Sequence, residues 1–192
     1  MTRSLLRYVR RKLTSARYSA AIGILAGAAC VLALHVTSRE VTGMVAFQIS
    51  SPVFKQNQMI PSKHTCDGAD VSPPLLIGNI PAGTKSLALI VDDPDAPAGT
   101  WVHWVLWNID PKTTEIGEDS VPSGAAQGMN DFKKSKYGGP CPPSGTHRYF
   151  FKLYALDAAI DPGKGATKAG LERSMRGHVI EYAELVGLYK RK

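Results

Sequence analysis

The sequence predicts a mainly β domain with few helices, and three observations support this class. Residues 87–91, 101–109 and 149–156 are apolar runs with the length of strands. The last two runs are apolar on both faces, which is typical of central strands in a packed sheet. Segments rich in proline and glycine separate the runs and indicate turns.

The remaining elements can be placed from local pattern. Residues 47–54 alternate between apolar and polar and predict a first strand, in which Pro52 marks an edge or a bend. Residues 59–81 are rich in loop-forming residues. Residues 110–146 are long and poor in regular pattern, and unstructured segments of this length are usually functional or disordered.

The C-terminal part has helical spacing. Thr167 is a plausible N-cap, and Leu171 with Met175 forms one helical stripe. Beyond Gly177, four residues again recur at helical spacing: His178, Tyr182, Leu185 and Tyr189. We therefore expect one or two C-terminal helices packed on the sheet.

Length and charge bound the class of protein. The 192 residues allow one domain of ordinary size, and a hydrophobic content of 44% is enough for a core. The net charge of +7 is local, since residues 1–40 hold seven Lys/Arg against one acid. Residues 41–192 hold sixteen Lys/Arg against fifteen acids, which argues against a broad nucleic-acid-binding face.

The N-terminus predicts targeting. Residues 1–18 are basic, residues 19–36 form an apolar helix that acts as a signal anchor or signal peptide, and residues 37–46 form a linker. This leaves residues 47–192 as the ligand-binding domain. With the basic segment inside, the domain would be membrane-anchored and periplasmic, or secreted if the signal is cleaved. A lipoprotein site at Cys30 and a mitochondrial presequence are minor alternatives.

Two rigid loops carry the candidate chemistry. The first is the acidic turn DPDAP at residues 93–97, in which prolines restrict the carboxylates of Asp93 and Asp95. The strand that follows carries Trp101 and His103. By strand alternation, His103 should share a face with Trp101, Val105 and Trp107.

The second loop is GGPCPPSGTHRY at residues 138–149. It enters a strand at His147, whose side chain should share a face with Tyr149. Arg148 should point the other way and pair with Asp95. Carboxylates beside two imidazoles and a phenol can hold a phosphoryl group, and the glycines at 138–139 would let backbone N–H groups approach an anion.

Structural alternatives exist for these residues. A histidine on an apolar strand, such as His103, is usually a satisfied core residue. Asp93 and Asp95 can simply cap a turn. The presence of His147 at an equivalent place on a second strand favours the site.

The motifs resemble the phosphatidylethanolamine-binding protein family, which includes the Raf kinase inhibitor proteins, in its bacterial and archaeal form. The resemblance rests on these motifs: DPDAP with WVHW, GPCPPSGTHRY, HTCDG at 64–68, SPPL at 72–75, PAGT at 81–84 and GHV at 177–179. The resemblance covers residues 47–189. It implies a β-sandwich with a small pocket at one end and C-terminal helices beside it, binding phosphate, phosphorylated groups or phospholipid headgroups.

The resemblance also implies site residues. The ligand-binding positions are Asp93, Trp101, His103, His147 and Tyr149. The reasoning from the two loops adds the supporting positions Asp95, Pro94, Gly139 and Arg148. No cofactor is expected, and the partners are the small anionic ligand, a membrane through residues 19–36 and an unidentified protein, with no nucleic acid.

Two cysteines remain once Cys30 is assigned to the apolar segment. Cys66 and Cys141 each lie in a loop that leads toward the site. In an oxidising compartment they would form a disulfide, and the alternative is two buried free thiols.

Three functions compete. The first is a non-enzymatic binding protein, with inhibition of a kinase or protease as the family's further implication. The second is a hydrolase with Cys141 or Ser144 as nucleophile and His103 or His147 as base, although no nucleophile elbow is present. The third is a metal site, for which the available ligands have no recognised spacing: His64, Cys66, Asp93, His103 and His147.

Overall fold

The computed structural model describes residues 45–191. The basic segment 1–18, the apolar helix 19–36 and most of the linker 37–46 lie outside these residues. Within 45–191, no helix has the length and apolar character needed to cross a membrane.

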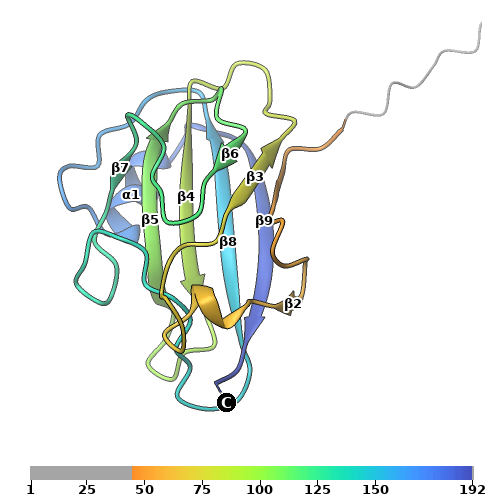
Figure 1. Ribbon diagram of the computed structural model, residues 1–192. Helices are drawn as coiled ribbons and strands as arrows, with labels where there is room; N and C mark the ends of the chain where they lie inside the picture. Colours follow the sequence, from red (N-terminus) through yellow and green to blue (C-terminus); the bar gives the residue numbers. More distant parts are fainter. Residues whose placement is uncertain (1–44, 192) are drawn as a thin grey trace, which may run out of the picture. The chain divides into compact units, whose positions relative to one another are not determined.

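Two sheets form the described domain. The larger has the order β2-β9-β8-β4-β5-β7, and the smaller has the order β1-β3-β6 (Figure 1). The strands of the larger sheet are β2 (Gln58–Met59), β4 (Ser86–Asp93), β5 (Trp101–Ile109), β7 (Ala126–Gln127), β8 (His147–Leu156) and β9 (Val179–Tyr189). Those of the smaller sheet are β1 (Gln48–Ser50), β3 (Leu75–Gly78) and β6 (Glu115–Ile116). The helices are the 3-10 turn η1 (Ser62–His64) and α1 (Lys168–Met175).

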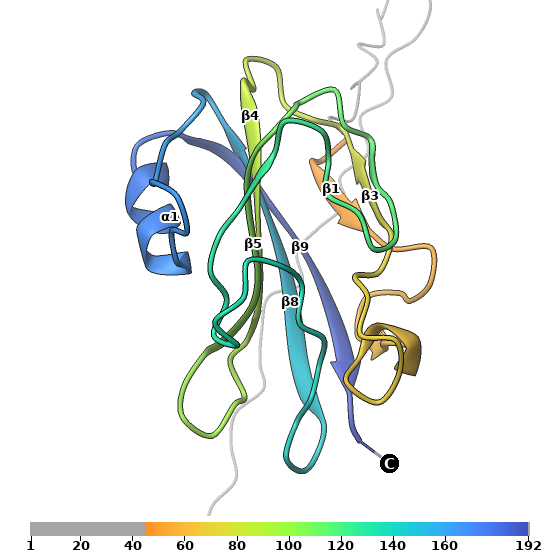
Figure 2. The same ribbon diagram turned by 60° about the vertical axis from the view of Figure 1, so that its left-hand side comes forward.

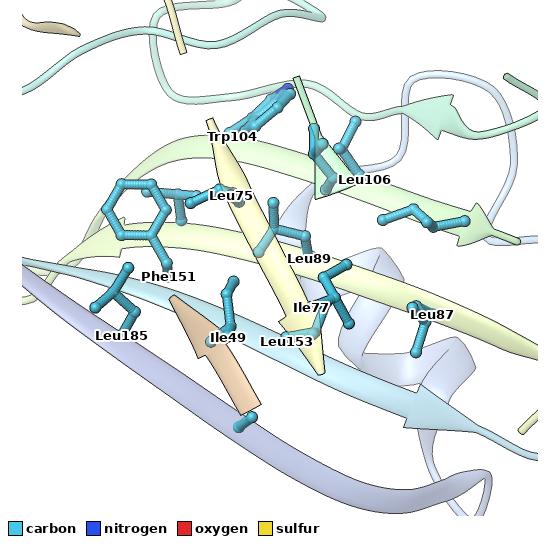
Figure 3. Close-up of a cluster of buried hydrophobic side chains, with 14 of the residues drawn as sticks. Ile49, Leu75, Ile77, Leu87, Leu89, Trp104, Leu106, Phe151, Leu153 and Leu185 are labelled. Atoms are coloured by element: carbon cyan, nitrogen blue, oxygen red, sulfur yellow. The ribbon is translucent and has the colours of Figure 1, made fainter. Parts of the chain in front are cut away.

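The larger sheet is covered on both faces. Figure 2 shows β1 and β3 on one side of it and α1 on the other. On the first side, Ile49, Leu75 and Ile77 of the small sheet face the apolar side chains of the large one (Figure 3). On the second, Leu171 and Met175 of α1 join a separate buried cluster. Both central strands are therefore buried on both faces, and the predicted β-sandwich is present.

The predicted strands are found with small differences in length. β5 has the predicted bounds, whereas β4 and β8 extend beyond the predicted runs toward the site. The first strand is shorter than predicted and ends at Ser50, before Pro52. This shortening agrees with the effect of proline, which lacks the donor that a ladder needs.

The C-terminal prediction is half wrong. α1 is the helix expected from Leu171 and Met175, but residues 179–189 form strand β9 and not a second helix. β9 pairs antiparallel with β8 from Leu156 to His147. The steps of four residues, from His178 to Tyr182 and from Leu185 to Tyr189, fit a helical stripe and also a strand face, because four is a multiple of two, whereas the step of three between them fits only the helix. Pairing with β8, which is distant in sequence, decides the outcome.

Candidate functional site

The site lies at one end of the sandwich. The loop that follows β4 and the loop that precedes β8 lie at this same end in both views (Figures 1 and 2). Between them is a cavity of about 340 Å³. It is lined by Asp93, Ala96, Pro97, Ala98, Trp101, His103, Phe132, Cys141, Pro142, Pro143 and His147. The structure thus brings together four of the five residues that were predicted to bind a ligand.

A β-bulge in β5 directs His103 toward this cavity. Val91 of β4 pairs with Trp104 while the next residue, Asp92, pairs with Val102, so His103 is an extra residue in β5. Its ring contacts that of Tyr149 edge-on, with centroids 5.2 Å apart. The bulge breaks the alternation on which the face prediction depended.

The face predicted for His103 is therefore right for Trp101 and wrong for Val105 and Trp107. Val105 and Trp107 pack in the cluster beneath α1, on the far side of the sheet from the cavity. Trp101 and His103 both contact the ring of Phe132, each at a centroid distance of 5.4 Å, on the cavity side. The imidazole of His103 faces the cavity because the bulge adds one residue to β5 before Trp104.

The environment of His103 favours the neutral imidazole. The residue is only 2% exposed. Burial lowers the pKa of His103, while the hydrogen bond to Gly138 and the charge of Asp93 oppose that shift. Nδ1 lies 2.6 Å from the carbonyl oxygen of Gly138. Because a carbonyl only accepts, Nδ1 is the nitrogen that carries the proton.

Asp93 has a structural role and a role in the site at once. Its Oδ2 is 2.8 Å from Nδ1 of His147, and both side chains are buried. Its Oδ1 accepts the backbone N–H of Asp95 at 2.8 Å, which closes the turn. Turn capping and orientation of the imidazole thus come from the two oxygens of one carboxylate.

Arg148 and Asp95 join the two loops, as expected from the sequence. The guanidinium donates to both carboxylate oxygens, at 2.9 Å from Nε and 2.6 Å from Nη2, and the Arg148 backbone N–H adds a bond of 3.0 Å. The side-chain hydrogen bonds to Arg148 lower the pKa of Asp95 to about 2. The pair lies at the surface, outside the cavity.

Besides Asp95 and Arg148, three more predicted positions lie outside the cavity lining. Tyr149 packs behind His103, and its hydroxyl is buried without a hydrogen-bond partner within residues 45–191. Burial and the charge of Asp93 raise the pKa of Tyr149. Pro94 is exposed in the turn. Gly139 donates its N–H to Oδ1 of Asp70 at 2.7 Å, so this N–H is already used and the expectation that it approaches an anion is wrong.

Gly139 is required for a different reason. A Cβ at this position would lie 2.7 Å from the carbonyl oxygen of His64 and 2.7 Å from Cα of Thr65. Only glycine lets the loop before β8 approach the η1 segment this closely.

Cys66 and Cys141 form a disulfide that joins the same two segments, with a Cα–Cα distance of 5.4 Å. Cys141 in this state has no free thiolate to act as a nucleophile. Ser144, the other candidate nucleophile, is exposed and does not line the cavity. The residues proposed for a hydrolase are therefore not arranged as one.

Two of the five metal ligands considered from the sequence, His64 and Cys66, lie outside the cavity that contains the other three. Nδ1 of His64 is 3.1 Å from the carbonyl oxygen of Val71, and Cys66 is in the disulfide. Among the described residues there is no group of three histidine, cysteine or acidic side chains placed to hold a metal.

Phe132, which forms one wall of the cavity with Trp101, was not predicted as a site residue. It lies in the segment 110–146, for which no structure was predicted. The available signal is a single aromatic residue within the polar run 130–136, NDFKKSK. Its contacts with Trp101 and His103 are long-range and could not be read from that run.

Comparison with known proteins gives a consistent result. The family described as phosphatidylethanolamine-binding protein matches residues 50–190. A UPF0098 protein of Pyrococcus horikoshii is 52% identical over 151 residues, covering 74% of this chain and 76% of that protein. A UPF0098 protein of Methanothermobacter thermautotrophicus is 49% identical over 148 residues, covering 74% and 98%.

Solved structures agree with these relatives. A phosphatidylethanolamine-binding protein homologue from Chlamydia trachomatis is 40% identical, with a TM-score of 0.74 over 77% of this chain and 99% of that one. E. coli YbcL, described as a member of the mammalian family, is 34% identical, with a TM-score of 0.72 over 77% and 100%.

Proposed function

The chain belongs to the phosphatidylethanolamine-binding protein family, and from that premise we propose that it is a non-enzymatic binding protein for a small phosphorylated ligand. The ligand would be phosphate, a phosphate ester or a phospholipid headgroup. The observation that carries the proposal is the convergence of Asp93, His103 and His147 on one cavity. A protein kinase or protease is the expected class of protein partner by family.

The cavity has a polar base and an apolar rim. Asp93 and the two imidazoles supply the polar atoms, and Trp101 can add an indole N–H. The other lining residues are mainly prolines, alanines and the Phe132 ring. This division suits a ligand with a compact charged head and a less polar remainder, since pockets are usually apolar with a few placed polar groups.

The test is a titration of the full chain with phosphate and with phosphoethanolamine, followed by the NMR signals of the histidine side chains. We expect both ligands to shift the signals of His103 and His147 and to leave the signal of His178 unchanged. His178 is a matched control because it is exposed and bonded to Asp157 through Nδ1 at 2.8 Å. Unchanged His103 and His147 signals at saturating ligand, or release of inorganic phosphate from phosphoethanolamine, would contradict the proposal.

We also propose that the domain works in an oxidising compartment and is held at a membrane through residues 19–36. The disulfide supports the first part, because Cys66 and Cys141 are both exposed and such bonds persist outside the reducing cytosol. Cell fractionation combined with thiol labelling tests both parts. The proposal requires a membrane or periplasmic fraction in which Cys66 and Cys141 resist labelling before reduction; a soluble cytosolic protein with two reactive thiols would contradict it.

A further inference from the structure

His103 presents a hydrogen-bond acceptor to the cavity. Its Nδ1 is committed as a donor to the carbonyl oxygen of Gly138, at 2.6 Å. In a neutral imidazole the other nitrogen then carries a lone pair and no proton. Nε2 has no partner within residues 45–191, and it is not sealed inside the protein as the Tyr149 hydroxyl is. Since His103 lines the cavity, this nitrogen is available to a ligand.

Burial keeps this acceptor unprotonated, because it favours the neutral ring and lowers the pKa of His103. The hydrogen bond to Gly138 and the carboxylates of Asp93, Asp92 and Asp70 act in the opposite direction, toward the imidazolium, but their effect is smaller than that of burial. From β8, the ring faces His147 across the cavity and packs against Tyr149.

The base of the cavity is therefore rich in acceptors. Asp93 and His103 both line the cavity and both carry acceptor atoms. Nδ1 of His147 is engaged with Oδ2 of Asp93, so the indole N–H of Trp101 is the side-chain donor that the lining offers to a ligand. An oxyanion without a proton would place its own lone pairs against Nε2 of His103 and against Asp93, and buried polar groups left unpaired in this way cost about 1–3 kcal/mol each.

We propose that His103 makes the pocket selective for a phosphoryl group that brings its own proton, namely inorganic phosphate or a phosphate monoester carrying a P–OH group. The P–OH would donate to Nε2 of His103, while another phosphoryl oxygen accepts from the indole N–H of Trp101. Sulfate has the same shape without a proton, and a phosphodiester has no P–OH, so both are excluded. This inference rests on the proposed function and narrows its ligand class.

The first test is isothermal titration of the full chain at pH 6, where about half of a phosphate monoester carries a P–OH, with methyl phosphate, inorganic phosphate, sulfate and glycerophosphoethanolamine. The last of these is a lipid headgroup diester, so the series separates a free phosphate or monoester from a lipid source. We expect the first two to bind at least about tenfold more tightly than the others, since one unmade hydrogen bond at a buried site costs about 1–3 kcal/mol. If sulfate binds as tightly as methyl phosphate, the inference is wrong. If the diester binds as tightly, its ammonium group and not a P–OH is the donor to His103, and the inference is also wrong.

A pH series shows where the proton resides. The second pKa of a phosphate monoester is about 6, so if only the proton-bearing form binds, the affinity for methyl phosphate should fall about 50-fold from pH 6 to pH 8. Sulfate should stay weak throughout this range. A parallel rise in sulfate affinity at pH 6 would show that the protein supplies the proton, which contradicts the assignment.

A variant tests the residue itself. His103→Gln places an amide, which can donate, near the position of Nε2, and it should reduce the ratio of methyl phosphate to sulfate affinity by about tenfold. Ser144→Ala is the matched control, because Ser144 is exposed in the same loop and does not line the cavity. An unchanged ratio in a folded His103→Gln protein counts against the inference. If no phosphoryl ligand binds the wild type at any pH, both the proposed function and this inference are wrong. If phosphate binds but methyl phosphate is not preferred over sulfate, only this inference is wrong.

Discussion

Asp93 is the residue on which the polar base of the cavity depends. Its two oxygens hold the turn at Asp95 and the imidazole of His147, so the side chain sets both the shape of one loop and the orientation of the ring. Within residues 45–191, no other side chain forms a hydrogen bond with the His147 ring. The orientation of His147 is therefore controlled from β4 and not from its own strand.

The variant Asp93→Ala removes both acceptors. The buried Nδ1–H of His147 would lose its partner, which costs about 1–3 kcal/mol of stability. We expect phosphate affinity to fall at least about tenfold as the ring loses its fixed orientation. Urea denaturation and calorimetry measure the two effects. Asp161→Ala, which removes a turn acceptor far from the site, serves as the control; equal losses in both variants would contradict the role of Asp93.

The ion pair of Asp95 and Arg148 predicts a pH dependence of stability. The pKa of Asp95 is lowered in the folded state to about 2, below its unfolded value near 3.8. The pair therefore stabilises the protein fully above about pH 4, and this contribution is lost as the pH falls toward 2. Since the pair is solvent-exposed, the loss is small, at most a few degrees in Tm.

Thermal unfolding of Asp95→Asn measures this effect. Its Tm should lie below that of the wild type at pH 7 and converge with it near pH 2. A difference in Tm that persists undiminished at pH 2 would show that Asp95 acts through something other than its charge.

Single residues also mark the limit of prediction from sequence. The acidic turn and the HRY strand entry were identified because proline, glycine and carboxylates have local preferences. The bulge at His103 could not be identified from the sequence, because it depends on how β5 pairs with β4. The bond from Gly139 to Asp70 joins residues 69 positions apart and was likewise not predictable from local sequence.

At the scale of elements, a buried charge attaches α1 to the sheet. Asp92 of β4 is fully buried on the face opposite to Asp93. Its carboxylate pairs with Lys152 of β8, 2.8 Å from Oδ1, and with Lys168 of α1. Adjacent aspartates thus serve opposite faces of the sheet, one the cavity and the other the helix.

We expect Asp92→Ala to lower the free energy of unfolding by about 3 kcal/mol, near the lower end for a broken buried ion pair. The lower end applies because Lys152 and Lys168 keep about a fifth of their side-chain surface exposed and can recover some hydration. Chemical denaturation measures the loss. Glu172→Ala is the control, because Glu172 is exposed and its ion pair with Lys168 is long, at 3.8 Å, and therefore weak. A comparable loss of stability in Glu172→Ala would contradict the role of Asp92.

The elements differ in how well sequence predicts them. β5 and β8 were predicted because burial on both faces makes them continuously apolar. β9 was not predicted as a strand, because the apolar residues in its first half do not mark a buried face. Val179, Ile180 and Tyr182 are all at the surface. Without a clear alternation there, helical and extended periods fit equally, and long-range pairing with β8 decides between them.

At the scale of the whole domain, the larger sheet is shared by two separate cores. The cluster that includes Leu89 and Phe151 lies beneath the small sheet, and the cluster that includes Ile90 and Leu171 lies beneath α1. Because β4 contributes alternate residues to both, loss of one core exposes the back of the other. This arrangement favours unfolding as one cooperative unit.

The Cys66–Cys141 disulfide closes a covalent loop between residues that are 75 positions apart in the sequence. Cross-linking residues this far apart restricts the unfolded chain, and removing such a bond typically costs about 2–5 kcal/mol. We expect the double variant Cys66→Ser, Cys141→Ser to lose stability in that range in urea denaturation. It should also bind phosphate more weakly, since Cys141 lines the cavity and its loop would be less restrained.

Reduction provides the internal control for this prediction. A thiol reductant should bring the wild type to the stability and affinity of the double variant and should leave the variant itself unchanged. If the wild type keeps its stability after complete reduction, then the contacts of Gly139 with the His64–Thr65 backbone are sufficient to hold the two segments together. In that case the disulfide would not be what couples the loop before β8 to the rest of the domain, and the cavity would keep its affinity in a reducing compartment.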